Sequence, residues 1–160
     1  MPSHPLVTFD FSQAWVSLVK IVVTYLLTFP IGWEREREAH SVGVRTFPIV
    51  AIASCGYVLL AASADASSQS RVLQGLIAGI GFVGGGAILK EGTSIRGTAT
   101  AASIWGTGVV GAAVAMGRYE IAVILSVFNF LTLKVLWRYK QKLSREPATQ
   151  EEDGKGERRG

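Results

Sequence analysis

Two uncharged apolar stretches, residues 72–89 and 98–116, constrain this chain more than any other feature. Both are rich in glycine and alanine, and a short polar connector, residues 90–97, joins them. A helix needs roughly 20 apolar residues to cross a hydrocarbon core about 30 Å thick, and each stretch is close to that length. Small residues also let membrane helices approach closely, and packing must hold such helices together in lipid. The chain is therefore predicted to be an integral membrane protein.

Composition agrees with a single membrane domain. The 160 residues are 49% hydrophobic, and the mean hydropathy is +0.33 although the last 20 or so residues are strongly polar. The net charge is +4, and the basic residues cluster at the ends of apolar runs. That placement indicates orientation in the membrane and contact with lipid headgroups, so no nucleic-acid partner is expected.

The apolar runs predict an all-α integral membrane fold with five transmembrane helices. The membrane domain is expected over residues 14–137. A periplasmic or extracellular segment, residues 1–13, precedes it, and a basic, largely disordered cytoplasmic tail, residues 138–160, follows it. The five predicted spans cover residues 14–33, 47–64, 72–89, 98–116 and 119–137.

Lysine and arginine residues outside the spans set the orientation. Twelve of them fall on the side that holds the connectors 34–46 and 90–97 and the C-terminal segment. The other side holds two, Arg71 and Arg118. Because cytoplasmic loops carry the basic excess, the N-terminus is predicted outside and the C-terminus inside, which requires an odd number of spans. Five spans satisfy that requirement in a multi-pass membrane protein.

The third predicted span contains a glycine pattern that resembles a nucleotide-binding motif. Residues 79–84 read G-x-G-x-x-G, but they lie inside a continuous apolar run and no acidic residue follows near the expected offset. A helix-packing seam is the favoured interpretation, and a break of the third helix at the triple glycine is the alternative. The predicted seam comprises Gly75, Gly79, Gly81, Gly84, Gly85, Gly86, Gly106, Gly108 and Gly111.

Polar residues of the two basic connectors are predicted to form one cytoplasmic layer. Three interpretations stay open: a solvated surface, a paired structural network, or a ligand or partner site. Carboxylates there could hold Mg²⁺ through water, and arginines could bind phosphate or an acidic partner. No catalytic constellation and no cluster with metal-ligand spacing can be assembled, so we expect neither enzyme activity, a metal site nor a cofactor. The layer comprises Glu34, Arg35, Arg45, Thr46, Glu91, Arg96 and Thr98.

The chain also contains a weak internal repeat. Arg45-Thr46 leads into the second predicted span as Arg96-Gly97-Thr98 leads into the fourth. Two parallel helical hairpins followed by a fifth helix would produce this pattern. Thr46 and Thr98 are interpreted either as N-cap residues or as parts of a pseudo-symmetric anion site at two helix N-termini.

Four ordered segments resemble signature motifs of the MgtC/SapB membrane protein family. They are GWERE at residues 32–36, GVRT at 43–46, GIGFVGGGAI at 79–88 and IRGTATAASIW at 95–105. The resemblance runs from about Ala14 to Trp137. It implies a bacterial inner-membrane protein with about five spans, whose relatives are linked to growth at low magnesium, acid resistance and survival inside host cells. The virulence-associated branch, understood to inhibit the membrane ATP synthase, has a soluble C-terminal domain, and this chain looks like a short form without it.

The resemblance and the residues together predict a non-enzymatic regulator of a membrane partner in adaptation to low magnesium, acid or host stress. The alternative is a small-ion transporter or channel subunit with a path between spans three and four. Beyond membrane lipid, the expected partners are a further membrane protein and other copies of the same chain.

Overall fold

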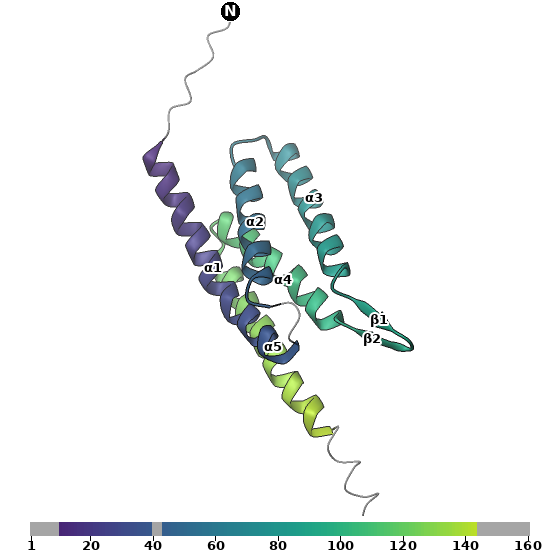
Figure 1. Ribbon diagram of the computed structural model, residues 1–160. Helices are drawn as coiled ribbons and strands as arrows, with labels where there is room; N and C mark the ends of the chain where they lie inside the picture. The colour runs from purple at the N-terminus through teal and green to yellow at the C-terminus, as the bar shows by residue number, and fades with distance from the viewer. Residues whose placement is uncertain (1–9, 40–42, 144–160) are drawn as a thin grey trace, which may run out of the picture.

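The computed structural model describes residues 10–39 and 43–143, which form five helices and one two-stranded hairpin (Figure 1). Most of the predicted outer segment and most of the predicted tail lie outside the described residues. The elements are α1 (Phe11–Ala39), α2 (Thr46–Ala61), α3 (Ala66–Gly85), β1 (Leu89–Glu91), β2 (Ser94–Arg96), α4 (Thr98–Ala115) and α5 (Tyr119–Leu143).

Successive helices run in alternating directions, so that α1 begins and α5 ends at opposite ends of the bundle (Figure 1). The closest association is between α2 and α4, and α1 and α5 also pack on α4. The helix α3 packs on α2 and α4, on the side away from α1 and α5. The internal repeat predicted the helical hairpins α1–α2 and α3–α4. These two hairpins contact each other mainly through their second helices, α2 and α4.

The connector after α3 differs from the all-α prediction. Residues 89–96 form an antiparallel β-hairpin in which Leu89 pairs with Arg96, and Gly92 at the turn has a φ of +60°. The helix α3 ends at Gly85, four residues before the predicted end of the third span, since consecutive glycines are poor helix formers. The fold is thus mostly helical, with one short strand pair at one end of the bundle.

The start of α3 is set by Asp65, which the apolar pattern alone did not identify. Its carboxylate accepts hydrogen bonds from the backbone N–H groups of Ser67 and Ser68, at 3.0 and 3.1 Å, and from both serine hydroxyls. These hydrogen bonds, those from the hydroxyls first, lower the pKa of Asp65. With Asp65 as its N-cap, α3 begins at Ala66, six residues before the start of the predicted third span.

Two helices among the described residues are long and apolar enough to cross a membrane. They are α1, over Phe11–Arg37, and α4, over Thr98–Ala115, while α2 is a shorter apolar helix. The outer faces of the bundle carry large apolar side chains, for example Leu60, Phe82 and Phe128, which are 80%, 85% and 66% exposed. Such an apolar exterior suits contact with lipid.

The interior of the bundle depends on close approach of backbones around α4. A Cβ on Gly111 would overlap the carbonyl oxygen of Ala51 in α2, and a Cβ on Gly108 would overlap the side chain of Ile80 in α3. Close contacts of this kind replace the hydrophobic force that lipid does not provide between helices. The sequence therefore places glycine where α2, α3 and α4 meet.

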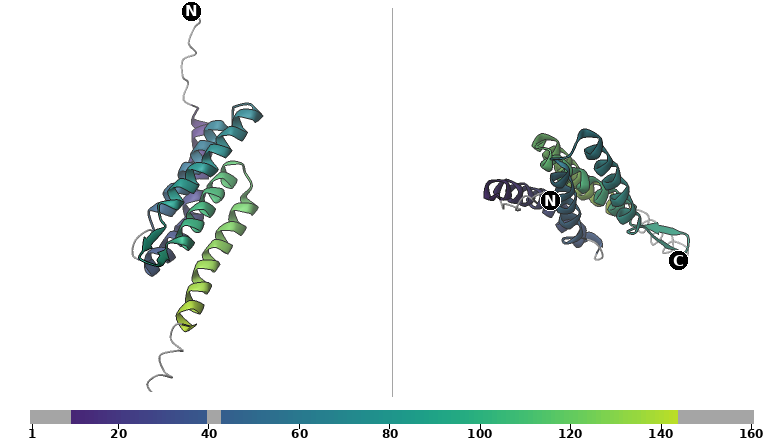
Figure 2. Two further views of the ribbon diagram at one scale, coloured as in Figure 1. Left: turned by 90° about the vertical axis from the view of Figure 1, so that its right-hand side faces the viewer. Right: turned by 90° about the horizontal axis from the view of Figure 1, so that it is seen from above.

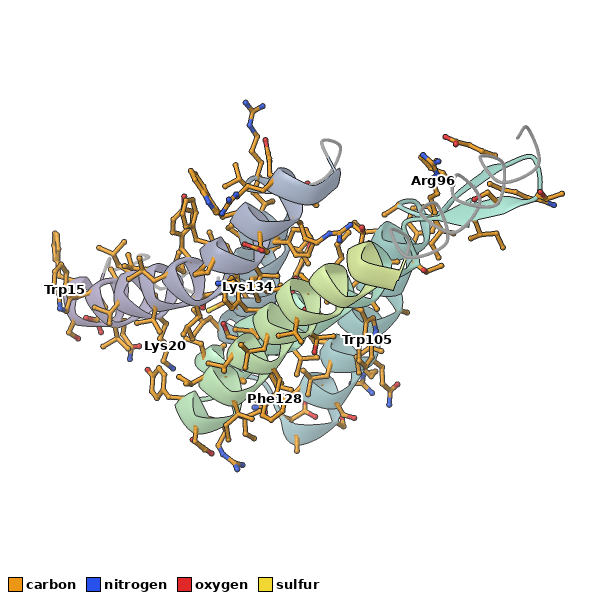
Figure 3. All side chains as sticks on the ribbon, turned by 90° about the horizontal axis from the view of Figure 1, so that it is seen from below. Trp15, Lys20, Arg96, Trp105, Phe128 and Lys134 are labelled. Carbon is orange, nitrogen blue, oxygen red and sulfur yellow. The ribbon has the colours of Figure 1, made fainter. Side chains whose placement is uncertain are left out.

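Lys20 of α1 forms a hydrogen bond to α4 inside the bundle. Its Nζ donates a 2.7 Å hydrogen bond to the carbonyl oxygen of Ala115, the last residue of α4. A cation at a helix C-terminus interacts favourably with the helix dipole and satisfies an otherwise free carbonyl. Figure 3 shows Lys20 and Lys134 on the long helices, while Arg96 lies apart from them at the hairpin. Lys134 lies over the ring of Phe130, 5.2 Å from its centroid.

Candidate functional site

A buried arginine ties α1 to the start of α4. Arg35 is 9% exposed, and its Nη2 donates a 2.6 Å hydrogen bond to the hydroxyl oxygen of Thr100, which is itself 5% exposed. A charged group is costly to bury unless hydrogen bonds compensate for the water that it loses. The Thr100 hydroxyl provides such an acceptor and fixes the last turns of α1 against α4.

The end of α1 also holds the turn that leads into α2. The carboxylate of Glu36 accepts a 2.8 Å hydrogen bond from the backbone N–H of Val44. Gly43 packs directly on the Glu36 side chain, and a Cβ there would overlap it. A Cβ on Gly32 would approach the carbonyl oxygen of Gly43 to 3.0 Å. The first and second signature segments, residues 32–36 and 43–46, are therefore contact partners.

The third and fourth signature segments meet in the same manner. A Cβ on Gly84 in α3 would approach the Ala101 carbonyl oxygen of α4 to 3.0 Å. Gly97 has a φ of +86°, in the left-handed region, and a Cβ there would overlap the carbonyl oxygen of Ala87. Together with the Arg35–Thr100 hydrogen bond, these contacts bring all four segments to one end of the bundle.

The predicted polar layer separates into an inner and an outer part. Arg35 turns inward to Thr100, whereas Glu91 and Arg96 form an exposed ion pair at 3.7 Å on the hairpin. Arg45 is also exposed. Glu34 and Thr46 are half-buried, and Thr98 is exposed. The structure thus joins Glu91 to Arg96 and does not join either of them to Arg35.

The N-cap interpretation of Thr46 and Thr98 is wrong by one residue. The N-cap positions are Arg45 and Gly97, and neither makes a side-chain capping bond. The two threonines are instead the first residues of α2 and α4. Gly97 occupies its position because the backbone there is left-handed, a conformation that threonine would adopt only with strain.

The predicted glycine seam divides between contact and open positions. Gly84, Gly108 and Gly111 lie against neighbouring helices as described above, and a Cβ on Gly106 would approach the Asn129 amide nitrogen of α5 to 3.1 Å. Gly86 lies near carbonyl oxygens of its own helix. The remaining four, all in α3, have no atom within 4 Å of a Cβ position: Gly75, Gly79, Gly81 and Gly85.

Two of these open glycines border an apolar pocket between α2 and α3. The pocket has a volume of about 510 Å³, and Gly75 and Gly79 line it on the α3 side. Ala53 and Tyr57 line it on the α2 side. The described residues that line this pocket carry no charge.

Most hydroxyl groups inside the bundle bond to backbone carbonyls. Thr28, Ser54 and Thr107 donate to carbonyl oxygens of their own helices. The Ser126 hydroxyl of α5 donates a 2.5 Å hydrogen bond to the Leu27 carbonyl oxygen of α1. Asn129 Nδ2, also of α5, donates a 3.3 Å hydrogen bond to the Ser103 carbonyl oxygen of α4. Ser126 and Asn129 therefore contribute to helix packing, as side-chain hydrogen bonds between membrane helices do, whereas the other three hydroxyls are satisfied within their own helices.

Sequence reasoning missed Thr100 and Glu36 as site residues. Both lie inside signature segments, where the TAT repeat at 98–100 and the alternating charges at 34–38 marked polar positions. The partner of Thr100 could not be inferred, because Arg35 and Thr100 are 65 residues apart in the chain. Among the residues that the structure describes, no group of three His, Cys, Asp or Glu side chains could hold a metal ion.

A helical bundle with an apolar exterior, glycine-mediated helix contacts and a buried arginine at one end defines a small helical membrane protein. The chain belongs to the MgtC family, whose family model matches residues 21–142.

Curated relatives support this assignment. Protein SrpB of Synechococcus elongatus is 33% identical over 135 residues, which cover 74% of each chain. Protein MgtC of Salmonella typhimurium strain LT2 is 28% identical over 84% of this chain and 58% of its own length. Protein MgtC of Brucella abortus is 38% identical over 65% of this chain and 44% of its own length. The chain thus spans about half of the MgtC proteins that it matches. No solved structure matches the chain.

Proposed function

We propose that this chain is a five-span protein of the bacterial inner membrane that regulates a membrane partner and has no enzymatic activity of its own. The partner would be contacted from the cytoplasmic end, during adaptation to low magnesium, acid or host stress. One observation carries the proposal: polar groups inside the bundle are used in helix packing, whereas charged groups at the predicted cytoplasmic end, Arg45, Glu91 and Arg96, are exposed. These exposed charges provide a surface for recognition that needs no path through the bundle.

The proposed topology follows from the basic residues and can be tested directly. Single cysteines at Arg45 and Arg96 would react only with reagents that reach the cytoplasm, and one at Arg71 would react from outside. Reaction of the Arg45 and Arg96 positions from opposite sides would overturn the topology. The alternating direction of the five helices in Figure 1 is compatible with the proposed arrangement.

Transport along a path between α3 and α4 is the alternative function. The contacts of Gly84 with Ala101 and of Gly108 with Ile80 favour the regulatory proposal, because backbone and side chain fill that interface. Protein reconstituted in liposomes is expected to give no Mg²⁺ flux above that of empty liposomes. Flux that is lost in Arg96→Ala or Gly85→Leu would favour transport instead.

The regulatory proposal is tested in cells that depend on this protein for growth at low magnesium. Arg45→Glu combined with Arg96→Glu should abolish growth while the protein stays in the membrane at its normal level. Arg71→Glu, which reverses a charge at the opposite end, is the matched control and should leave growth unchanged. Normal growth of the doubly substituted strain would indicate a structural packing subunit.

The proposal includes a homo-oligomer formed through α3. Gly81 and Gly85 are exposed and have open space around them, and Gln74 and Ala78 are also exposed on this helix. Small residues would allow a helix of a second copy to approach closely. Gly81→Leu should reduce the stoichiometry measured in lipid nanodiscs. The control is Ile80→Leu, on the buried side of α3, which should keep the stoichiometry of the unmodified protein.

A further inference from the structure

The β-hairpin has two chemically different faces. Lys90 pairs with Ile95, while Leu89 pairs with Arg96 and Glu91 with Ser94. Because side chains alternate along a strand, Lys90 and Ile95 share one face and the other four residues share the opposite face. All six residues are exposed, and Ile95 is 62% exposed.

The face opposite to Lys90 and Ile95 is suited to water. Glu91 and Arg96 form an ion pair there, with side chains that are 61% and 72% exposed, and Ser94 adds a hydroxyl. Leu89 is the one apolar residue on that face and lies next to the bundle. The face of Lys90 and Ile95 instead combines a β-branched apolar side chain with a cation and contains no carboxylate. The apolar stem and charged head of lysine suit a boundary between hydrocarbon and water.

The position of the hairpin matches this boundary. The hairpin projects from the bundle at the end where α3 stops and α4 starts. Figure 1 shows it pointing obliquely outward and down, and the view from above in Figure 2 shows its sideways projection, on the side away from α1. In the membrane placement proposed above, on which this inference rests, that end lies at the level of the inner-leaflet headgroups. A hairpin that extends sideways there runs along the membrane surface.

We propose that the Lys90 and Ile95 face of the hairpin docks on anionic phospholipid headgroups of the inner leaflet. Ile95 enters the boundary between headgroups and acyl chains, and the ammonium group of Lys90 contacts lipid phosphate. Apolar burial and attraction to anionic lipid act together in such interfacial binding. The Glu91 and Arg96 face then points to the cytoplasm, where it is available to a protein partner.

Spin labels on adjacent residues test this orientation. Cys55 is buried and is the one cysteine of the chain, so Cys55→Ala gives a background for single labels. Nitroxide labels are placed at Ile95→Cys and, on the opposite face of the same strand, at Ser94→Cys. The protein is measured in nanodiscs that contain phosphatidylglycerol. The label at position 95 should be several-fold more accessible to oxygen, relative to a water-soluble nickel complex, than the label at position 94.

A third label separates failure of this inference from failure of the membrane placement. Phe128 on α5 is 66% exposed, and Phe128→Cys should report lipid. If position 128 reports lipid while positions 94 and 95 are equally accessible to the nickel complex, the docked hairpin is wrong and the membrane placement stands. If position 128 itself reports water, the membrane placement is wrong.

Charge variants test the role of the headgroups. Lys90→Gln should reduce the contrast between positions 95 and 94, and so should replacement of phosphatidylglycerol by phosphatidylcholine. Glu91→Gln, on the neighbouring residue of the other face, is the matched control and should leave the contrast unchanged. A contrast that does not depend on Lys90 or on anionic lipid would overturn the proposed headgroup contact.

Discussion

Arg35 and Thr100 are joined by a 2.6 Å hydrogen bond from Nη2 to the hydroxyl oxygen, although 65 residues separate them in the chain. Arg35 lies near the end of α1 and Thr100 in the first turn of α4, and both side chains are buried. The bond therefore joins two helices that are distant in sequence, at the end of the bundle where the hairpin begins.

Thr100→Val should destabilise the protein, because the buried guanidinium then loses an acceptor for its charge. A hydrogen bond to a charged group contributes about 1.5–3 kcal/mol, which sets the expected loss in the free energy of unfolding. Unfolding by SDS in mixed micelles, followed by circular dichroism, measures it. Thr100→Ser keeps the hydroxyl and should remain much closer to the unmodified protein. Equal stability of the two variants would contradict a role for this hydrogen bond.

Gly97→Ala should destabilise the start of α4. The φ of +86° is unfavourable for alanine, at a cost of about 1–3 kcal/mol, and the new Cβ would overlap the Ala87 carbonyl oxygen. Gly92→Ala is the matched control, since its φ is +60° but its surroundings are open. The melting temperature in detergent should fall further for Gly97→Ala than for Gly92→Ala. A larger fall for Gly92→Ala would show that the contact with Ala87 is unimportant.

Gly111→Ala should destabilise the protein, whereas Gly75→Ala should not. At Gly111 a Cβ would overlap the Ala51 carbonyl oxygen, so α2 and α4 must separate and stability should decrease. At Gly75 a Cβ meets open space, and alanine is favoured over glycine in a helix by about 1 kcal/mol. Gly75→Ala should therefore unfold at an equal or higher temperature than the unmodified protein. Thermal unfolding of both variants in the same detergent compares the two positions directly.

The first turn of α3 should lose protection at low pH. Hydrogen bonds from Ser67 and Ser68 lower the pKa of Asp65 in the folded protein below its unfolded value, about 3.9. The resulting stabilisation is present above the unfolded pKa and is lost as the pH falls through the folded pKa. Amide exchange, corrected for intrinsic rates, should show weaker protection of residues 67–71 at acidic pH. Asp65→Asn should remove this pH dependence, and its persistence in that variant would assign it to another group.

Local sequence patterns predicted much of the helical fold. The uncharged run at 98–116 corresponds to α4 within one residue, and Tyr119 begins both the predicted fifth span and α5. The end of the third helix was predicted only by the alternative interpretation, a break at the triple glycine, because an apolar run does not distinguish a helix that ends at Gly85 from one that continues to Leu89. Hydrophobicity continues through both residues, whereas the helix ends where glycine removes the preference for helical backbone.

The polar layer and the glycine seam could be predicted as sets of residues and not as contacts. Position in the two basic connectors identified Arg35 and Arg96 equally, yet one is buried against Thr100 and the other is exposed on the hairpin. The G-rich pattern of α3 likewise gave no means of separating Gly84, which contacts Ala101, from Gly85, which faces open space. Neighbouring residues on a helix point in directions about 100° apart, so helix placement decides which of them meets a neighbour.

The sequence by itself determined that this chain forms apolar helices with a basic excess on one predicted side, because hydropathy and charge are properties of single residues and short runs. Its signature segments also pointed to the MgtC family, which the family model confirms. The tertiary structure alone decided that these segments meet at one end, that Arg35 turns inward and that the connector projects as a two-faced hairpin. The inward position of Arg35 depends on a contact with Thr100, 65 residues away in the chain, and only the packed helices specify such contacts. The hairpin depends on backbone pairing within residues 89–96, which hydropathy and charge do not specify.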